Sequence, residues 1–286
     1  MNEIEHSYIE TNGVTLHVAI AGQKDGPLVI LLHGFPEFWY GWNQQVTPLV
    51  KAGYRVVIPD QRGYNLSEKP EEIDAYKLTT LRDDVIGIID QLGYEQASII
   101  GHDWGGAVAW YLAASHPSYV NRLIVINIPH PEIMKKALYT KPTQLLRSSY
   151  MLFFQLPTLP EKFLQSNQFQ SLKTALRMTS NRNTFDDHTL HMYLEAWSMP
   201  YSLTGMLNWY RAIRRGSLNH VPISKITIPV CIIWGKNDQF LPLELAKRSL
   251  EMCQDGQLIA VDEATHWVHH EQPTILNQLI RQFLTN

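Results

Sequence analysis

Residues 7–22 alternate between apolar and polar side chains on both sides of an Asn12-Gly13 pair. An alternation with a period of two places one kind of side chain on each face of a strand. An Asn-Gly pair between two such runs is a strong short-range signal for a tight turn. The first part of the sequence is therefore predicted to form a β-hairpin.

Four short runs that are almost entirely apolar follow this hairpin. They are Pro27–Leu32, Tyr54–Ile58, Ala97–Ile100 and Arg122–Ile128. Strands that are apolar on both faces belong to parallel sheets covered by helices on each side. The segments between the runs have helical patterns, at Trp39–Lys51, Leu78–Leu92 and Gly105–Ser115. This alternation predicts an α/β fold with a doubly wound, mostly parallel sheet.

The alternation of strands and helices stops between residues 130 and 222. This stretch has helical periodicity, several prolines and many aromatic residues, but no pattern of a buried parallel strand. The alternation resumes with strands at Val230–Trp234 and Gln257–Val261 and helices at Leu243–Met252 and Thr274–Leu284. We therefore expect a helical cap inserted after the sixth core strand. The predicted domains are a core of residues 1–129 and 223–286 and a cap of residues 130–222.

The 286 residues are 45% hydrophobic and 18% charged with a net charge of −3, as in an ordinary globular protein. Without an excess of either charge, neither nucleic acid nor a membrane is an expected partner. No secretory signal and no run of transmembrane length is visible, which favours a cytoplasmic location. Cys231 and Cys253, in a predicted strand and a predicted helix, are expected to be reduced packing residues. The 12 histidines show no spacing typical of a metal site, so no cofactor is expected.

Residues 101–106 read Gly-His-Asp-Trp-Gly-Gly and follow the apolar run Ala97–Ile100 directly. A strand, a sharp glycine-flanked turn and a helix of small residues together form the layout of a nucleophile elbow. Most elbows carry serine at the centre, whereas this one carries Asp103. A carboxylate can displace a leaving group from saturated carbon, and the resulting ester must then be hydrolysed. Asp103 is therefore the candidate nucleophile.

Two further candidates follow later strands of the predicted sheet. Asp238 comes after Val230–Trp234, and His266 comes after Gln257–Val261. In an open parallel sheet, functional groups gather at the carboxyl ends of the strands. The chain order of nucleophile, acid and histidine is that of the α/β-hydrolases. This order favours Asp238 over Asp262 as the acid.

The same order favours His266 over His269 and His270, which lie closer to the last predicted helix. Another motif, His33-Gly34-Phe35-Pro36, directly follows the predicted strand that ends at Leu32 and precedes the first predicted helix. The backbone N–H groups of Phe35 and Trp104 are the expected oxyanion hole.

Two other polar features have structural interpretations. His33 is interpreted as a histidine that bonds its own loop. The segment 60–64, Asp-Gln-Arg-Gly-Tyr, is interpreted as a loop organised by a contact between aspartate and arginine.

These motifs together resemble the soluble epoxide hydrolase family of the α/β-hydrolase superfamily, over nearly the whole chain. The matching stretches are His33–Pro36, His102–Gly105, Asp238, His266, Leu207–Arg211 and Ser149–Pro157. Members of this family carry two cap tyrosines that bind and protonate the epoxide oxygen. The last two stretches assign these tyrosines to Tyr210 and Tyr150.

The resemblance implies an enzyme that opens an epoxide to a vicinal diol through an alkyl ester on Asp103. Its partners would be a small apolar epoxide and water, its role detoxification, and its state a monomer or a homodimer. Apolar cap residues either line a substrate pocket or pack on the core: Met151, Phe153, Phe154, Trp197, Met199, Met206 and Trp209. The sequence leaves open the physiological substrate, the preferred enantiomer and the ring carbon attacked.

Two alternatives are a haloalkane dehalogenase with the same nucleophile and a ligand-binding protein without turnover. Many dehalogenases have asparagine where this chain has Phe35, and fluoroacetate dehalogenases have arginine where it has Trp104. Some dehalogenases take their acid from the strand before the cap, where Ile126-Asn127-Ile128 offers no carboxylate. A binding protein would not need all three of Asp103, His266 and Asp238.

Overall fold

The computed structural model describes residues 4–219, 221–222 and 225–285. Eight strands form one sheet: β1 (Glu5–Thr11), β2 (Val14–Ala21), β3 (Leu28–Leu32), β4 (Arg55–Pro59), β5 (Ala97–His102), β6 (Val120–Ile126), β7 (Ile226–Gly235) and β8 (Cys253–Val261). Their order across the sheet is β1-β2-β4-β3-β5-β6-β7-β8. The pairs β1–β2 and β2–β4 are antiparallel, and the strands from β4 to β8 run parallel. This confirms the predicted, mostly parallel α/β sheet.

The hairpin predicted at the start of the chain is confirmed. Thr11 of β1 pairs with Val14 of β2, so Asn12 and Gly13 alone form the turn. Both have positive φ, of 45° and 75°, which is the backbone conformation that this tight turn requires. The other edge of β2 pairs with β4 and joins the hairpin to the parallel strands.

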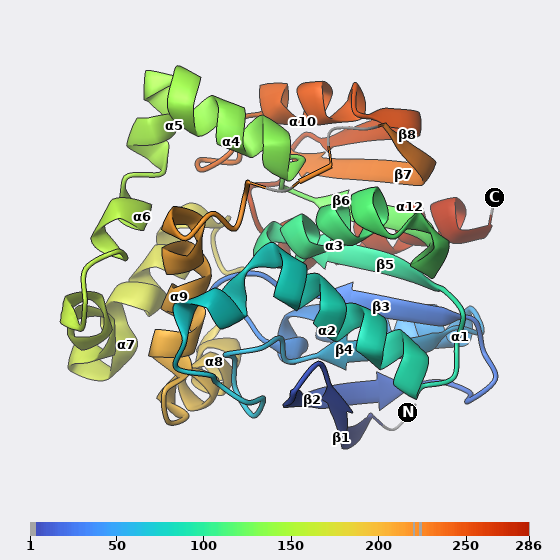
Figure 1. Ribbon diagram of the computed structural model, residues 1–286, viewed down its shortest axis with the longest axis horizontal. Coiled ribbons are helices and arrows are strands. Elements are labelled where there is room, and N and C mark those ends of the chain that lie inside the picture. Colours follow the sequence, from blue (N-terminus) through green and yellow to red (C-terminus); the bar gives the residue numbers. More distant parts are fainter. Residues whose placement is uncertain (1–3, 220, 223–224, 286) are drawn as a thin grey trace.

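Helices cover both faces of the sheet, because the side chains of each central strand alternate in direction. In β3, Val29 and Leu31 join a cluster with α1 (Asn43–Lys51) and α12 (Pro273–Thr285). Ile30 and Leu32 join a second cluster with α2 (Leu78–Gln91), α3 (Asp103–Ser115) and α10 (Leu243–Leu250). Figure 1 shows α2 and α3 in front of the strands. The ends of these helices lie within two residues of the predicted ends, with one exception. The segment predicted as a helix from Trp39 begins with a 3₁₀ helix at Trp39–Trp42, and α1 starts only at Asn43.

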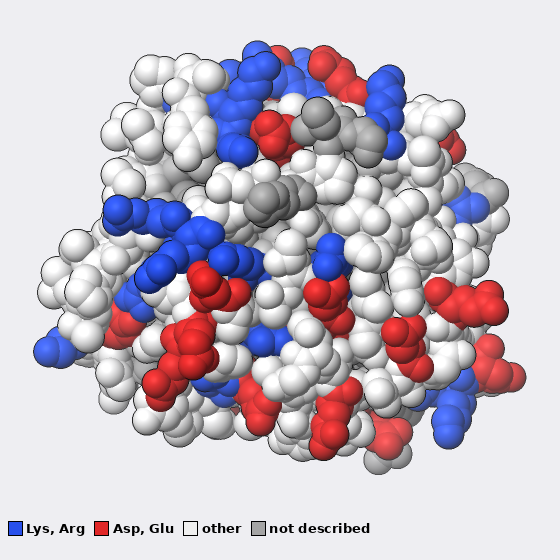
Figure 2. Space-filling view, in the orientation of Figure 1, with Lys and Arg blue, Asp and Glu red and all other residues white. Residues whose placement is uncertain are grey.

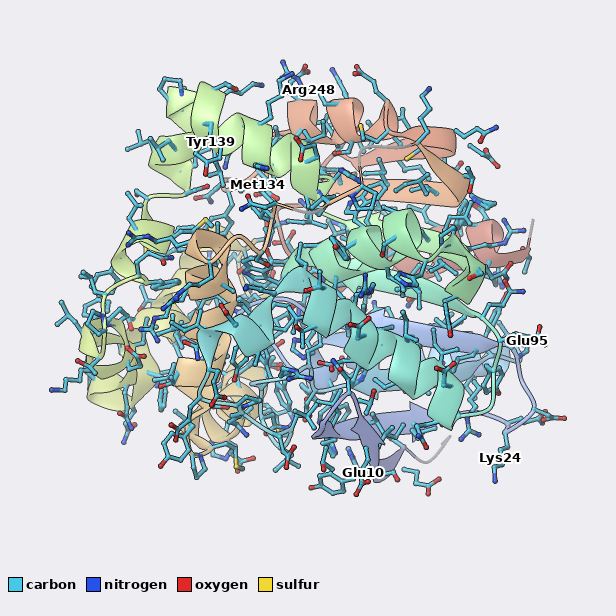
Figure 3. The ribbon with its side chains drawn as sticks, viewed as in Figure 1. Glu10, Lys24, Glu95, Met134, Tyr139 and Arg248 are labelled. Carbon is cyan, nitrogen blue, oxygen red and sulfur yellow. The ribbon has the colours of Figure 1, made fainter. Side chains whose placement is uncertain are left out.

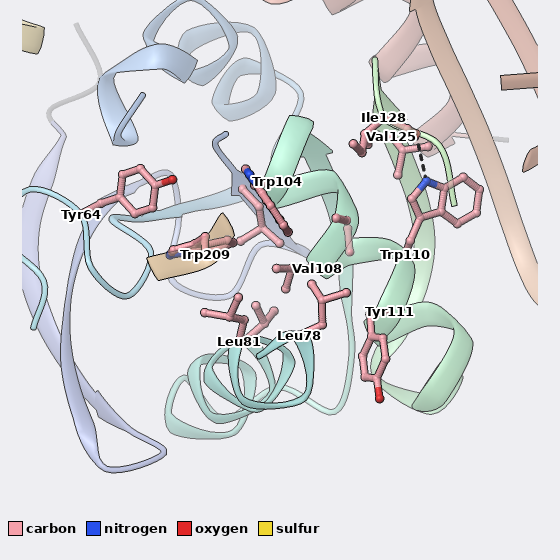
Figure 4. Close-up of a cluster of buried hydrophobic side chains, with 14 of the residues drawn as sticks. Tyr64, Leu78, Leu81, Trp104, Val108, Trp110, Tyr111, Val125, Ile128 and Trp209 are labelled. Atoms are coloured by element: carbon pink, nitrogen blue, oxygen red, sulfur yellow. Dashed lines mark hydrogen bonds between the residues drawn. The ribbon is translucent and has the colours of Figure 1, made fainter. Parts of the chain in front are cut away.

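The core between α2 and α3 is closely packed around aromatic side chains (Figure 4). Leu78 and Leu81 of α2 meet Val108 of α3, and each is at most 3% exposed. Trp110 of α3 is fully buried, and its indole N–H donates a 3.2 Å hydrogen bond to the carbonyl of Ile128. A buried indole N–H needs such an acceptor. The bond fixes α3 against the chain that leaves β6.

Helices fill the segment between β6 and β7, as the sequence predicts. They are α4 (Pro131–Thr140), α5 (Pro142–Arg147), α6 (Tyr150–Phe153), α7 (Leu159–Thr179), α8 (Asp187–Ser198) and α9 (Ser202–Arg214). In Figure 1 most of them lie at the end of the sheet beyond the strand tips. Trp209 of α9 is fully buried and donates a 2.9 Å hydrogen bond to the carbonyl of Arg62 in the core. The predicted boundary between residues 222 and 223 falls at the edge of the described residues, because positions 223 and 224 lie outside them.

The last two strands start earlier than predicted. β7 begins at Ile226, with an irregular register up to Pro229, and β8 begins at Cys253. Cys253 therefore lies in a strand and not in a helix. The polar stretch after it, from Gln254 to Gly256, is exposed, so the sequence there lacks the apolar signal of a buried strand. Cys231 and Cys253 are free and buried, and burial raises the pKa of each thiol to about 12.

The loop after β4 is organised differently from the prediction. Arg62 does not pair with Asp60 but with Asp84 of α2, through bonds of 2.8 Å from Nε and 2.6 Å from a terminal nitrogen. Asp60 instead accepts hydrogen bonds from His17 of β2 at 2.6 Å and from the backbone N–H of Trp39 at 3.0 Å. Both carboxylates are buried, so each needs partners, and the partners come from distant elements.

Charged side chains of both signs appear on the face of the molecule shown in Figure 2, separated by wide uncharged areas. Across the residues that the structure describes, no helix combines the length and the hydropathy needed to cross a bilayer.

Candidate active site

The turn from β5 into α3 places Asp103 in a left-handed backbone conformation, with φ of +48°. Aspartate tolerates this region better than most residues do. The turn also needs close backbone contact, because a Cβ on Gly101 would lie 2.6 Å from the carbonyl oxygen of Gly105. The structure assigns Asp103 as the first residue of α3, two positions before the predicted helix start. The N-terminal end of the helix therefore supports a negative charge on its carboxylate.

His266 stands between the other two residues that are expected to act with it. The Nδ1 atom of His266 is 2.8 Å from Oδ2 of Asp238, and its Nε2 atom is 3.6 Å from Oδ2 of Asp103. The backbone N–H groups of Phe240 and Leu241 donate to the second oxygen of Asp238, at 2.7 and 2.9 Å. Asp238 is therefore held on both oxygens, and it orients the imidazole toward Asp103.

The rival residues lie elsewhere. Asp262 is largely exposed and pairs with Lys236 on the surface. His269 and His270 do not line the cavity beside Asp103 and instead bond a buried glutamate, Glu37, at 3.0 and 2.7 Å. The strand order thus selects the acid and the histidine that are in contact.

Of the two predicted oxyanion donors, one is seen in contact with the nucleophile. The backbone N–H of Phe35 donates a 3.0 Å hydrogen bond to Oδ1 of Asp103. Trp104 follows Asp103 in the first turn of α3, and the donation from its N–H remains a prediction. His33 behaves as interpreted: its Nδ1 donates to the carbonyl of Gly34 at 3.1 Å and its Nε2 accepts from the backbone at 3.0 Å.

Tyr150 of α6 and Tyr210 of α9 are in contact and line the same cavity as Asp103. Their ring centroids are 5.9 Å apart, and Tyr210 also packs edge-on against Trp104 and Phe35. Burial and the nearby charge of Asp103 raise the pKa of the Tyr150 hydroxyl. Burial raises the pKa of Tyr210 well above its usual value. Both phenols are therefore protonated at neutral pH and can donate.

A cavity of about 370 Å³ connects these groups. Asp103, His266 and both tyrosines line it, with Asp238 behind the histidine. The remaining wall is almost entirely apolar and comes from α4, α6, α7 and α9 as well as the core. Figure 3 labels two side chains of α4, Met134 and Tyr139. Met134 lines the cavity, whereas Tyr139 is 83% exposed on the outside.

Six of the seven apolar cap residues divide between the two expected roles, whereas Met199 is half-buried and belongs neither to the cavity wall nor to the buried core. Met151, Phe153 and Phe154 line the cavity. Trp197, Met206 and Trp209 are buried in the core packing and are not part of the wall. The wall gains side chains from α4 and α7 that the sequence did not single out, because only the folded cap brings those helices over the sheet.

The charges of the three central residues depend on one another. Burial favours the neutral form of Asp103, but the charges of His266 and His102 lower the pKa of its carboxyl. Burial alone would lower the pKa of His266, yet Asp238 and Asp103 together raise it to about 10. At neutral pH the site therefore holds an ionised carboxylate beside a protonated imidazole.

The sequence analysis did not predict a role in the site for two polar residues, Asn127 and Glu37. Asn127 directly follows β6, with φ of +50°, and its amide donates a 2.6 Å hydrogen bond to Oδ2 of Asp238. Glu37 is 1% exposed and accepts hydrogen bonds from three histidines and a tyrosine. Each contact joins residues far apart in sequence, so neither leaves a local pattern.

Glu37, His269 and His270 also have the spacing of a metal site among the described residues, with ligand atoms within 4.8 Å of one another. The carboxylate of Glu37 is already occupied by N–H and O–H donors. Hydrogen bonding therefore accounts for this cluster without an ion.

Comparison with known proteins agrees with this architecture. The alpha/beta hydrolase fold family matches residues 27–273. The AB hydrolase superfamily protein YfhM of Bacillus subtilis is 54% identical over 286 residues, all of both chains. Human epoxide hydrolase 4 is 39% identical over 291 residues, which cover 98% of this chain and 78% of that protein. A crystal structure of the Bacillus megaterium epoxide hydrolase with an inhibitor superposes with a TM-score of 0.88 at 30% identity, covering 98% of this chain and all of the other.

The chain therefore belongs to the α/β-hydrolase superfamily, in the part of it that contains proteins named epoxide hydrolases.

Proposed function

We propose that this protein is an epoxide hydrolase that converts an epoxide to a vicinal diol through an ester on Asp103. The observation that carries the proposal is the meeting of one carboxylate and two protonated phenols in a single apolar cavity. A carboxylate can attack the ring carbon while the phenols hold the oxygen that leaves it. The proposal also has support from the named epoxide hydrolases among the relatives.

The first step is ring opening. Asp103 forms a bond to one ring carbon as the bond from that carbon to the epoxide oxygen breaks. The oxygen takes a proton from Tyr150 or Tyr210, which becomes a tyrosinate. Alkylation removes the charge of Asp103, so the pKa of His266 falls below about 10. The imidazolium proton of His266 then passes to the tyrosinate through solvent, which restores the neutral phenol and leaves His266 neutral.

The second step is hydrolysis of the ester. Neutral His266, oriented by Asp238, takes a proton from a water that attacks the ester carbonyl. The backbone N–H groups of Phe35 and Trp104 stabilise the oxyanion that forms. Collapse of this intermediate releases the diol, and the site returns to an ionised Asp103 beside a protonated His266. Epoxide and water are consumed in equal amounts, and no cofactor takes part.

The cavity favours a small apolar epoxide. Its walls offer aromatic and aliphatic side chains, and the polar atoms gather at the reacting groups. A pocket of this kind binds through apolar contact and uses few polar groups to orient its ligand. Aryl or alkyl substituents on the epoxide carbon therefore suit it.

The test is to trap the intermediate. The H266Q variant lacks the general base for the second step but keeps Asp103 and both tyrosines. Incubation with styrene oxide should add the mass of one epoxide molecule to the protein, and peptide mapping should place it on Asp103. Wild-type enzyme should release styrene diol.

Two controls define the result. The D103N/H266Q double variant should gain no mass. Bromoalkanes tested in parallel, with halide detection, address the dehalogenase alternative. Turnover of epoxides without any adduct in H266Q, or halide release faster than diol release, would contradict the proposal.

A further inference from the structure

Glu37 does not line the cavity, and its carboxylate receives hydrogen bonds from four side chains. His102, His269 and His270 approach it through ring nitrogens at 3.1, 3.0 and 2.7 Å. The hydroxyl of Tyr193 donates to the same carboxylate at 2.7 Å. A carboxylate that is 1% exposed needs donors of this number to remain charged.

One of these partners leads directly to the general base. His102, next to Asp103, faces Glu37 with Nδ1 and the backbone carbonyl of His266 with Nε2, at 3.1 and 2.9 Å. Both neighbours are acceptors, so the ring can donate to both only when both nitrogens carry a proton. His102 therefore links Glu37 to the loop of His266 through its two ring nitrogens. The two histidine rings are also in contact, with centroids 4.7 Å apart.

The other end of the cluster reaches the cap. Tyr193 belongs to α8, and Trp197, one turn further along that helix, donates a 2.6 Å hydrogen bond to the carbonyl of Pro36. Pro36 stands between Glu37 and Phe35, whose N–H contacts Asp103. Helix α8 therefore holds the loop that carries the Phe35 N–H at two adjacent residues, Pro36 and Glu37.

We propose that Tyr193 and Glu37 are positioning residues for hydrolysis of the ester. Through these two residues, the position of cap helix α8 determines how well the general base and the oxyanion hole are aligned. The inference rests on the proposed function. Ring opening needs Asp103 and the two cavity tyrosines, which neither positioning residue touches. Hydrolysis instead requires His266 and the Phe35 N–H to be in place at the same moment. His102 contacts the backbone carbonyl of His266, and α8 contacts the carbonyl of Pro36, the residue after Phe35.

The experiment compares Y193F with wild type and with Y201F. Tyr193→Phe keeps the ring and removes only the donor to Glu37. Tyr201 is a matched control, because it lies in the same region with its side chain 72% exposed. Rapid mixing with styrene oxide, acid quenching and intact-mass measurement give the rates at which the ester forms and disappears.

Y193F should form the ester within about twofold of the wild-type rate and hydrolyse it about tenfold more slowly, the low end of what loss of an outer hydrogen-bond partner costs at metal ligands. The ester should therefore accumulate during turnover, as it should not in Y201F. E37Q, which places an amide among donors, should show a larger loss in the same step. If E37Q does not fold, the Y193F result decides.

Equal hydrolysis rates in Y193F and wild type would overturn the inference. So would a parallel fall in both steps together with Tm, since that would show a merely structural role. Failure of the proposed function is distinguishable, because H266Q would then trap no ester and wild-type enzyme would release no diol.

Discussion

The side-chain amide of Asn127 donates a 2.6 Å hydrogen bond to Oδ2 of Asp238, the same oxygen that faces His266 at 2.8 Å. Asn127 directly follows β6 and Asp238 follows β7, so adjacent parallel strands bring the two side chains together. The carbonyl oxygen of the Asn127 side chain accepts from the N–H of Gly235 at 2.9 Å, which fixes the direction of the amide. A carboxylate at position 127 would thus lie close to Oδ2 of Asp238, the oxygen that orients the imidazole of His266.

This geometry predicts that the acid can be moved. D238N should slow ester hydrolysis by about ten-thousand-fold, as loss of the acid does in a comparable triad. The double variant N127D/D238N should recover a measurable part of this loss, because the carboxylate then approaches His266 from β6. Diol release measured under steady state, with N127D alone for comparison, gives the answer. No recovery in the double variant would show that position 127 cannot orient the imidazole.

The two phenols should affect ring opening only. Y150F and Y210F should each slow ester formation by about a hundredfold to ten-thousand-fold, the range typical of a general acid. The double variant Y150F/Y210F should form no detectable ester, while its Tm stays close to that of wild type. Stopped-flow mixing followed by mass measurement separates this step from hydrolysis. An active double variant would mean that another group protonates the oxygen.

The pKa of His266 should depend on the charge of its neighbour. D103N carries a neutral group in place of the carboxylate, as the ester does, so the pKa of His266 should fall below about 10 in this variant. Titration by NMR of the imidazole resonances measures it, and D262N is a matched surface control. An unchanged pKa in D103N would show that Asp103 does not support the imidazolium.

The same shift has a consequence for stability. The pKa of His266 is about 10 in the folded protein against a model value of 6.5, so protonation favours the folded state. This contribution is fully present below pH 6.5 and disappears as the pH rises through about 10. Unfolding in urea at pH 6 and pH 10 should therefore show a smaller loss for D103N than for wild type.

The buried pair of Arg62 and Asp84 predicts a large effect far from the chemistry. R62A leaves a carboxyl whose pKa burial already raises, without its two hydrogen bonds. The free energy of unfolding should fall by about 3–5 kcal/mol. Chemical denaturation measures the change, and R177A, which breaks an exposed pair with Asp187, is the control with little expected effect. Comparable values for both variants would contradict the expected importance of burial.

The sequence predicted those parts of the site that follow from local rules. Glycine spacing located Asp103, and the order of strands placed Asp238 and His266 at the same edge of the sheet. The Phe35 contact followed from a short motif at the end of a strand. In each case a single stretch of chain, together with the sheet topology, determines where the group lies.

The sequence did not predict the partners that only the folded chain brings together. Arg62 was expected to bond Asp60, two positions away, but a residue of α2 provides a better-placed carboxylate. Asn127 entered the sequence analysis only as a position that lacks the carboxylate some dehalogenases have there. Glu37 gave no signal, although two adjacent histidines far along the chain complete its surroundings.

The two cysteines acquire a meaning from the chemistry proposed for the cavity. Thiolates are strong nucleophiles, and electrophilic three-membered rings would alkylate them. Cys231 and Cys253 lie in β7 and β8, buried, with a pKa of about 12 for each thiol, so only a minute fraction of either is ionised at neutral pH. If the proposed function holds, both thiols should therefore resist alkylation by the substrate through many turnovers.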